Sequence, residues 1–467
     1  MGATFTEAHL RLKSLLRLSI AAFGAVTFTG SALSQSLIRD TEIEMMMREY
    51  ANPIIEAAEL DPNSVDLYLI GDMNFNAFVM GGQNIFFHTG AIITADQPNE
   101  IKGVLAHEIG HIAGAHLLRS GEASKSAMAT MLATMGLGLA AALAGEGGAG
   151  AALIASSQQF AALDYMTYSR AQESAADQAA VGYLDKTGQT SIGLVNTFER
   201  FRYQEVMSNA RRMQYFRSHP LSSQRIQALR NRVDNSPYAQ HADSPEEVAQ
   251  LRRIQGKIIG FMASPAQTFL RYPESDTSLP ARYARAVAYY KDGQLARARE
   301  HIEALIADEP DNPFFYELEG QMLFESGHIE ESIAPYERSV ELLPNAPLIR
   351  INLAGSLVAL GGEANLQLAR EHLNYALVAE PDNSFGWYQM SMVYQGLGDN
   401  AMAELATAER AYSVGDKRQA YTFATRARED LERGTPSWIR ASELIAVSTP
   451  TPEEMREIRR RERSNRR

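Results

Sequence analysis

Residues 98–118 read PNEIKGVLAHEIGHIAGAHLL, and this segment predicts the helix around which the first half of the chain folds. Asp96 is the expected N-cap, Pro98 suits the first turn, and Glu100 places an acidic side chain near the positive end of the helix dipole. A stripe of aliphatic residues recurs at helical spacing and is expected to face the core: Ile101, Leu105, Ile109 and Ile112. The pattern indicates an amphipathic helix that ends near Leu118.

The same helix carries the strongest chemical signal in the chain, His107-Glu108-Ile109-Gly110-His111. Residues four apart lie one above the other on a helix, so His107 and His111 can present ring nitrogens to one ion. Glu108, one step round the helix, would lie beside that ion. The alternative is a pair of surface histidines, which the helix-start signals and the intervening acid disfavour. The spacing therefore predicts a metal site with an adjacent general base.

The third metal ligand must be a histidine or a carboxylate, because the chain contains no cysteine and a catalytic zinc ion takes three protein ligands. Glu173 is the candidate, on a predicted helix that includes SRAQESAAD at 169–177. Asp177 follows one turn later on the same face, where it could accept a hydrogen bond from a ligand imidazole or pair with an arginine. Taken alone, such a Glu-x-x-x-Asp pair is more typical of an exposed helix face.

The remaining histidines do not have ligand spacing. His116 lies nine residues beyond His107, which turns it away from the metal face of a continuous helix, so it is expected to be a surface or packing residue. Four others stand apart from any candidate ligand in the sequence: His88, His301, His328 and His372.

A small sheet is predicted before the metal helix. Val65–Ile70 alternates in polarity like a strand, and two further strands, Asn76–Met80 and Asn84–His88, flank a Gly-Gly pair. Glycine tolerates the positive φ of a tight hairpin turn, so these two strands should pair antiparallel. An amphipathic helix, Thr41–Leu60, is expected before the sheet.

The second half of the chain repeats with a period near 34 residues. Gly293, Gly327 and Gly361 are 34 residues apart, and Gly398 follows after 37. Small residues stand seven positions before these glycines and large residues four positions before them: Ala286, Gly320, Ala354 and Ser391, then Tyr289, Leu323, Leu357 and Tyr394. This register is the signature of tetratricopeptide repeats, whose helix pairs stack into an α-solenoid with a concave binding groove. Four repeats are expected.

The start of the chain predicts export. Three basic residues between positions 11 and 17 precede the uncharged run Leu18–Gly30, and Ala32-Leu33-Ser34 has small residues at both positions that determine cleavage. This is the pattern of a secretory signal peptide; a soluble amphipathic helix is disfavoured because the run has no polar stripe. In a bacterial cell the mature chain would be periplasmic, and without cysteine it would fold there without disulfides.

Composition excludes several classes of function. The chain has 467 residues, of which 45% are hydrophobic and 21% charged, as in a globular protein. A formal net charge of −12, with no basic stretch interleaved with aromatics, argues against a nucleic-acid partner. The absence of cysteine excludes thiol nucleophiles and thiolate metal sites.

An apolar segment separates the two halves of the predicted metal site. Ala127–Ala144 contains no charged residue over 18 positions, near the lower limit for a membrane span. A single crossing would put Glu173 on the opposite side of the membrane from His107 and His111, which is incompatible with one metal site. The expectation is a mobile helical hairpin over 127–155 that covers the site and contacts the membrane surface, with glycines as hinges.

The metal helix and the Glu173 helix together resemble the zinc metallopeptidase family that includes the CAAX prenyl protease and HtpX. In that family a His-Glu-x-x-His helix is completed by a glutamate from a downstream Glu-x-x-x-Asp helix. Three more segments are similar to family motifs: Asn76-Ala77-Phe78 to the edge strand, Ser169-Arg170 to the residues before the ligand glutamate, and Ser218-His219-Pro220 followed by Arg225-Ile226 to a His-Pro segment.

The resemblance implies a role for each residue of the metal site. His107, His111 and Glu173 would hold one zinc ion per chain, and Glu108 would be the general base that passes a proton to the leaving amine. His219 would stabilise the oxyanion, take a ligand position on zinc in a resting enzyme, or serve as a structural cap.

Further residues would support the site and bind substrate. Asp177 and Arg225 would hold the metal ligands in place. Asn76, Ala77 and Phe78 would form an edge strand that receives protein or peptide substrate as an added strand, which requires little sequence preference.

The resemblance also implies the fold class and domain order. The chain should be mainly helical, with a zincin-like α+β metalloprotease domain that contains a small antiparallel sheet. The parts are a signal peptide (1–34), the metallopeptidase domain (35–235), a linker with a bridging helix at Pro245–Met262 (236–280), the tetratricopeptide domain (281–435) and a basic tail (436–467).

The combination of these domains resembles periplasmic members of the family that act in outer-membrane barrel assembly. The expected function is a zinc-dependent endopeptidase of the cell envelope that degrades misfolded or stalled outer-membrane proteins. The repeats would recruit clients or the assembly machinery. Two alternatives remain: a tetratricopeptide chaperone or scaffold with a structural or latent zinc site, and an integral-membrane processing protease.

Overall fold

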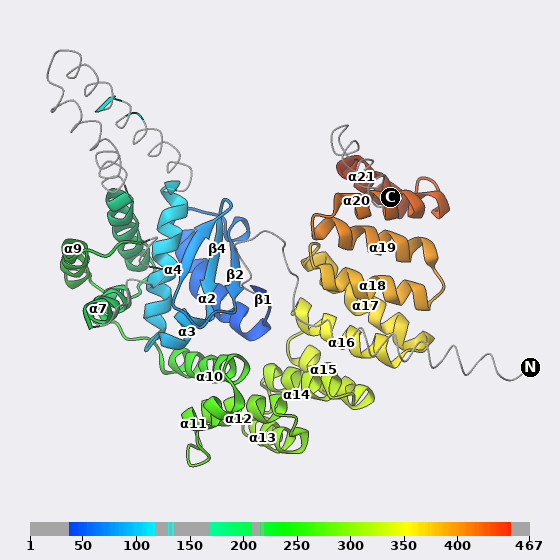
Figure 1. Cartoon of the computed structure of the whole chain (residues 1–467), viewed down its shortest axis with the longest axis horizontal. Helices are drawn as coiled ribbons and strands as arrows, with labels where there is room; N and C mark the ends of the chain where they lie inside the picture. The colour runs from blue at the N-terminus through cyan, green and yellow to red at the C-terminus, as the bar shows by residue number, and fades with distance from the viewer. Residues whose placement is uncertain are drawn as a thin grey trace, which may run out of the picture. The chain divides into compact units, whose positions relative to one another are not determined.

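The computed structural model describes residues 37–116, 129, 133–134, 169–207, 215 and 219–449 (Figure 1). The predicted signal peptide, nearly all of the predicted apolar hairpin and the basic C-terminal end lie outside the described residues. Among the described residues, no helix is long and apolar enough to span a membrane. The chain divides into two compact units, Met1–Met262 (unit 1) and Ala263–Arg467 (unit 2).

Unit 1 contains a four-stranded sheet with the strand order β1-β2-β4-β3. The strands are β1 (Leu37–Ile38), β2 (Asp66–Ile70), β3 (Ala77–Met80) and β4 (Asn84–His88). β3 and β4 pair antiparallel, and the φ values of 66° at Gly81 and 107° at Gly82 suit the tight turn between them, so the predicted hairpin is confirmed.

The sheet is mixed, whereas an antiparallel sheet was predicted. β2 pairs parallel with β4, with Leu69 opposite Phe87. The reason is that the hairpin adds its second strand to β2, and that strand runs in the same direction as β2. This order leaves β3 at the edge, paired with β4 alone among the described strands. An edge strand offers backbone N–H and C=O groups to a further strand.

Helices pack against the sheet to form one core. Figure 1 shows α4 alongside the sheet and α2 behind it, and both contact strands. The described helices of unit 1 are α2 (Thr41–Ala57), the short 3-10 helix η2 (Pro62–Ser64), α3 (Thr89–Thr94), α4 (Pro98–Ala113), a helix over 169–186, α7 (Ile192–Met207), α9 (Ser223–Asp234) and α10 (Pro245–Met262). The predicted α4 stripe is confirmed, because Ile101, Leu105 and Ile109 are buried and Ile112 packs against the core.

The ends of α4 differ from the sequence prediction. The N-cap is Gln97 rather than Asp96, and the N–H of Asn99 donates to the distant Asp243 carboxylate at 3.0 Å. Asp96 pairs instead with Arg200 at 2.8 Å. At the other end the helix stops at Ala113, earlier than predicted. A partner from a distant part of the chain therefore caps this helix, which local sequence patterns do not reveal.

The predicted bridging helix, α10, belongs to unit 1. Lys257 lies 2.7 Å from Asp40 and 3.3 Å from Glu42. Gln255 donates to the carbonyl oxygen of Ala95 at 2.7 Å, just after α3. These buried contacts extend the first compact unit to Met262, beyond the boundary expected at residue 235.

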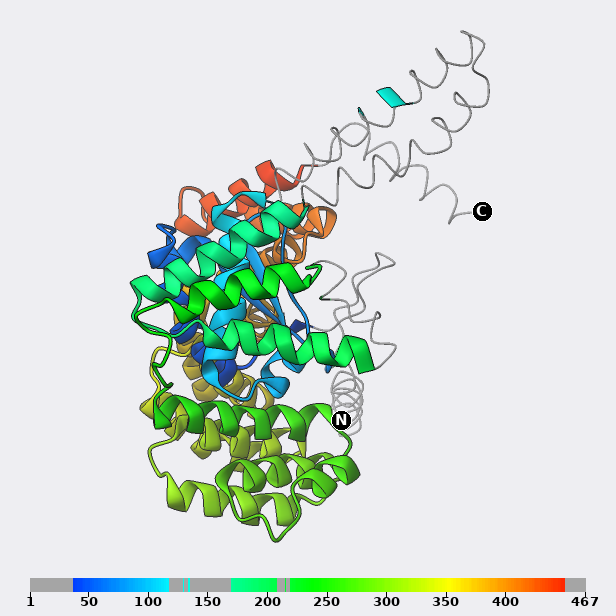
Figure 2. The ribbon, with the colours of Figure 1, turned by 90° about the vertical axis from the view of Figure 1, so that its left-hand side faces the viewer.

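Unit 2 is a stack of helix pairs that follows a short helix, α11 (Pro265–Arg271) (Figures 1 and 2). Five pairs are described: α12 (Leu279–Lys291) with α13 (Leu295–Asp308), α14 (Pro313–Glu325) with α15 (Ile329–Leu342), α16 (Pro347–Leu360) with α17 (Glu363–Ala379), α18 (Ser384–Gly396) with α19 (Asn400–Ser413), and α20 (Lys417–Asp430) with α21 (Pro436–Ser448). The small residue of the repeat pattern is required at Gly320, because a Cβ atom there would lie 2.7 Å from the Tyr336 ring. The helical repeat region is therefore confirmed.

The fifth pair occupies a region that was predicted to end the repeats and begin a tail. Gly434 follows Gly398 by 36 residues and has a φ of 89°, like the turn glycines of the other repeats. Ala427 stands seven positions before it and is buried, but position 430 holds an aspartate where a large residue was expected. Ala441 and Leu444 of α21 join a buried cluster. Residues 436–448 are therefore a packed helix rather than a tail.

Candidate metal centre

Two helices that are distant in sequence meet in unit 1. A Cβ atom on Gly110 of α4 would lie 3.0 Å from the carbonyl oxygen and 3.1 Å from the Cα of Ala176, in the helix at 169–186. Because glycine has no side chain, the two backbones approach closely here. Ala176 lies three residues after Glu173, so this contact places the glutamate opposite the histidines of α4.

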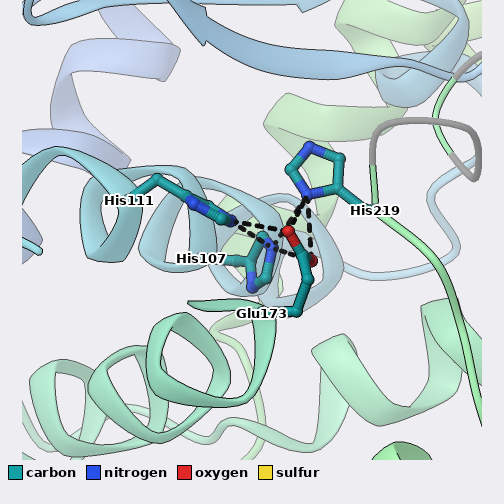
Figure 3. Close-up of side chains that lie close together, drawn as sticks. All are labelled: His107, His111, Glu173 and His219. Atoms are coloured by element: carbon teal, nitrogen blue, oxygen red, sulfur yellow. Dashed lines mark hydrogen bonds and ion pairs between the residues drawn. The ribbon is translucent and has the colours of Figure 1, made fainter. Parts of the chain in front are cut away.

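Figure 3 shows four side chains that converge on one point: His107, His111, Glu173 and His219. The Nε2 atoms of His107 and His111 are 3.1 Å apart, and each lies 3.4 Å from an oxygen of Glu173. Nδ1 of His219 lies 3.3 Å from Nε2 of His107 and 3.1 Å from Oε2 of Glu173. The fold thus brings together three segments that are far apart in sequence.

The cluster fits a transition-metal ion. Imidazole nitrogens and a carboxylate oxygen are ligands of zinc, and tetrahedral ligands at zinc-like bond lengths lie about 3.3 Å from one another. The donor atoms here are separated by 3.1 to 3.4 Å along the contacts given above. In the part of the chain that the structure describes, this is the one group of three or more such side chains close enough to share an ion.

Glu108 lies beside the cluster and is fully buried. Neither of its carboxylate oxygens has a hydrogen-bond partner among the described residues, and Oε1 lies 3.5 Å from Nε2 of His219. Burial raises the pKa of the Glu108 carboxyl group above its usual range. Buried carboxyl groups normally accept hydrogen bonds, so a buried carboxyl group with none from the described residues is a candidate to act on a bound molecule. A raised pKa suits proton transfer near neutral pH.

Two further residues contact side chains of the cluster. Oδ1 of Asp177 lies 3.0 Å from Nδ1 of His107, which directs the Nε2 of that ring toward the cluster. Arg225 of α9 donates from Nη2 to Oδ1 of Asp177 at 2.8 Å, and its Nη1 lies 2.8 Å from Oε2 of Glu173. The guanidinium also lies over the Phe198 ring, 4.9 Å from its centroid. Arg225 therefore links both carboxylates and offsets their charge.

The charges in the cluster are strongly coupled. Burial alone would lower the pKa of His107, but hydrogen bonds to Asp177 and Glu173 raise it to about 9. Burial and the charge of His107 lower the pKa of His111 to about 2. Burial opposes ionisation of Glu173, but the neighbouring charges of His219 and His107 hold its pKa below the usual range. Zinc binds neutral imidazole, so metal binding would have to displace a proton from His107 if that ring is protonated.

His219 lies between Glu173 of the cluster and the buried carboxyl group of Glu108. Its ring stacks on Tyr215, with centroids 4.7 Å apart and an interplanar angle of 30°, and its backbone N–H donates to the Tyr215 carbonyl at 2.8 Å. Nδ1 points toward Glu173 and Nε2 toward Glu108. The sequence left three roles open for His219: oxyanion stabilisation, a ligand position on zinc and a structural cap. The observed position is compatible with the ligand role.

The predicted substrate strand is only partly a strand. Ala77 and Phe78 lie on β3, while Asn76 precedes it and is buried, with its Nδ2 atom 3.3 Å from Nε2 of His88. Phe78 stacks on Phe86 of β4 with centroids 5.2 Å apart. His88 thus has a local partner and lies outside the metal cluster.

His116 lies outside the metal cluster and is a packing residue, as predicted, but it lies closer to the site than its spacing suggested. The residue is buried, and its Nδ1 atom lies 3.0 Å from Nδ1 of His111. The reason is that α4 ends at Ala113 and the chain turns back. The Gly114-Ala115 pair was a readable signal, because glycine after a helical pattern is a stop signal.

Comparisons with known proteins agree with this site. The model of peptidase family M48 matches residues 38–233, which include the whole cluster. The beta-barrel assembly-enhancing protease of Yersinia pestis is 25% identical over 412 residues, which are 86% of this chain and 82% of that protein. The protein of that name from Escherichia coli (strain K12) is 23% identical over 409 residues, with the same coverage. Metalloprotease YcaL of Escherichia coli (strain K12) is 30% identical over 177 residues, which are 37% of this chain and 63% of that protein.

Proposed function

We propose, from the premise that residues 38–233 form a domain of peptidase family M48, that this metalloprotease is a zinc-dependent endopeptidase of the cell envelope. The observation that carries the proposal is the convergence of His107, His111 and Glu173 beside Glu108, whose buried carboxyl group has no hydrogen-bond partner among the described residues. His107, His111 and Glu173 hold one zinc ion per chain. Bound zinc supplies a Lewis acid and lowers the pKa of water to about 7.

The other residues of the site prepare and complete the reaction. Glu108 takes a proton from the attacking water and passes it to the leaving amine, for which its raised pKa is suited. Asp177 orients His107, and Arg225 fixes the positions of the Asp177 and Glu173 carboxylates by contacting both.

Protein or peptide substrate binds along the edge of the sheet. β3 is an edge strand that contacts α4, so a peptide paired with Ala77 and Phe78 would run past the metal helix. Backbone hydrogen bonds give such a complex affinity with little dependence on side chains. We expect cleavage without strong sequence preference.

The proteins that this peptidase would cleave are proposed from the names of its relatives and from the helix pairs of unit 2. Two relatives that match 86% of this chain are named for beta-barrel assembly. A stack of helix pairs offers an extended surface for binding proteins. The proposed clients are misfolded or stalled outer-membrane proteins in the periplasm, recruited by unit 2 directly or through the assembly machinery. The predicted signal peptide and membrane-contacting hairpin at 127–155 belong to this proposal and lie almost wholly outside the described residues.

Replacement of Glu108 by glutamine tests the catalytic assignment. Glu108→Gln removes the base but none of the three metal ligands, so the variant should retain about one zinc ion per chain and lose cleavage of an unfolded protein such as casein. The loss of a general base should lower the rate by about 100-fold or more. Glu100→Gln is a matched control, since Glu100 is a buried acid of the same helix that pairs with Arg200. Undiminished proteolysis in Glu108→Gln would refute the assignment.

The scaffold alternative makes a different prediction in the same experiment. If unit 2 alone performs the function, Glu108→Gln should preserve outer-membrane protein assembly in cells as well as the wild type does. The burial of Glu108 beside the cluster, with no hydrogen-bond partner among the described residues, favours the peptidase, because a structural metal site requires the ligands but not Glu108.

A further inference from the structure

The imidazole of His116 contacts the side of His111 that faces away from the metal cluster. The Nδ1 atoms are 3.0 Å apart, the ring centroids are 4.9 Å apart, and the rings are inclined by 79°. His111 directs its Nε2 toward His107 and Glu173. If Nε2 binds a metal ion, the proton of neutral His111 must lie on Nδ1, and the Nδ1 of His116 is then placed to accept it.

A continuous helix could not make this contact. Residues five apart lie about 140° apart around a helix axis. Here α4 ends at Ala113, and Ala115 has a φ of 50°, a left-handed conformation that residues other than glycine rarely adopt. Gly114 makes room for the returning ring, because a Cβ atom on it would lie 2.4 Å from Nε2 of His116. The end of the helix is therefore shaped to bring His116 back onto His111.

A second contact ties His116 to the other half of the cluster. Gln172 donates from Nε2 to the carbonyl oxygen of His116 at 3.2 Å, and Gln172 immediately precedes Glu173. His116 is itself only 8% exposed, so it is part of the packed interior. The cluster is thus symmetrical in one respect: the Nδ1 of His107 faces Asp177, and the Nδ1 of His111 faces His116.

We infer that His116 is a positioning residue for the metal ligand His111. It accepts the hydrogen bond from Nδ1 of His111 and so holds that ring in the tautomer and orientation that leave Nε2 for the metal ion. His116 does not touch the ion or the substrate. The inference rests on the proposed metal-dependent function, and it adds a residue that determines how tightly the ion is held.

Three variants of the full chain test this role. His116→Phe keeps a ring but removes the acceptor, and His116→Gln replaces the ring with another acceptor. Gly114→Ala keeps His116 but displaces its ring with a methyl group. Gly182→Ala is the control, because a Cβ atom there would meet no atom within 4 Å. The measurements are the zinc dissociation constant by competition with a chromophoric chelator and the visible spectrum of the Co²⁺-substituted chain.

The expected results separate a hydrogen bond from simple packing. His116→Phe and Gly114→Ala should weaken zinc binding by about 10- to 100-fold, as removal of groups that orient ligand histidines typically does, and should alter the cobalt spectrum. His116→Gln should recover most of the affinity, and Gly182→Ala should match the wild type. Circular dichroism establishes that each variant is folded.

Two results would overturn the inference while the proposed function stands. One is wild-type zinc affinity and an unchanged cobalt spectrum in both His116→Phe and Gly114→Ala. The other is equal weakening in His116→Gln and His116→Phe, which would indicate packing. If the wild-type chain itself bound no zinc, the inference and the proposed function would both fail.

Discussion

The ring of His219 faces both Glu173 and Glu108, so it lies where a fourth ligand and an attacking water would compete. A catalytic zinc site keeps one position open, whereas four protein ligands close it. Stacking on Tyr215 favours the inward orientation of the ring. We therefore expect the described conformation to be a resting form that becomes active when His219 moves outward.

Removal of His219 should reveal this restraint. His219→Ala opens the fourth position and leaves the three proposed ligands, so basal cleavage of casein should rise several-fold while about one zinc ion per chain is retained. His241→Ala, at an exposed histidine of the same unit, should behave like the wild type. A fall in activity in His219→Ala would show instead that His219 acts on the substrate, for example on the oxyanion.

Single residues differ in how much of their role the sequence reveals. His107 and His111 could be paired from spacing, because four residues make about one helical turn wherever the helix lies. The contact of Arg225 with both Glu173 and Asp177 depends on how α9 packs, which spacing does not encode. His116 required knowledge of where α4 ends, and the continuous-helix assumption therefore misplaced it.

At the scale of secondary-structure elements, the site depends on the close approach of α4 and the helix at 169–186. The two meet where Gly110 faces Ala176, and three residues of the cluster, His107, His111 and Glu173, lie within one turn of this contact. Helices approach this closely only where side chains are small. Gly110 of the His-Glu-Ile-Gly-His segment therefore shapes the proposed metal site, although it has no side chain that could bind the ion.

A methyl group at this contact should loosen the site. In Gly110→Ala the added Cβ would lie 3.0 Å from the Ala176 carbonyl oxygen, so the helices must separate by a few tenths of an ångström. We expect weaker zinc binding and a loss of about 1–3 kcal/mol in the free energy of unfolding. Chelator competition and denaturant titration measure the two effects. Gly182→Ala should show neither, and equal behaviour of the two variants would contradict the role of this contact.

Elements with local signals were predictable, and those set by distant pairing were not. The β3–β4 hairpin follows from two glycines between alternating strands. The parallel pairing of β2 with β4 depends on which strand of the hairpin reaches β2. The fifth helix pair escaped detection because Asp430 replaces the large residue of the repeat pattern, although Gly434 kept the period.

At the scale of the whole molecule, each of the two units has hydrophobic clusters of its own among the described residues. One cluster in unit 1 has members between Ile38 and Met262, and two clusters in unit 2 have members between Phe324 and Ile445. The proposed metal site lies entirely in unit 1. Metal binding should therefore stabilise one unit and leave the other unchanged.

Calorimetry of the full chain should show this difference. We expect two unfolding transitions, and removal of zinc by EDTA should lower the midpoint of one of them. With zinc at about 100 times its dissociation constant, the stabilisation is about 2.7 kcal/mol, which corresponds to roughly 5–10 °C for a unit of this size. Glu108→Gln should retain the shift because it keeps the ligands. A shift of both transitions together would contradict independent units.

The order of the ligands along the chain has a consequence for the cell that makes this protein. During synthesis, the two histidines of α4 emerge before Glu173, and a catalytic zinc site uses three protein ligands. Under the proposed function, we expect a newly made polypeptide to lack peptidase activity until α4 and the helix at 169–186 have docked. The folding of unit 1 would then time the onset of proteolysis during biosynthesis.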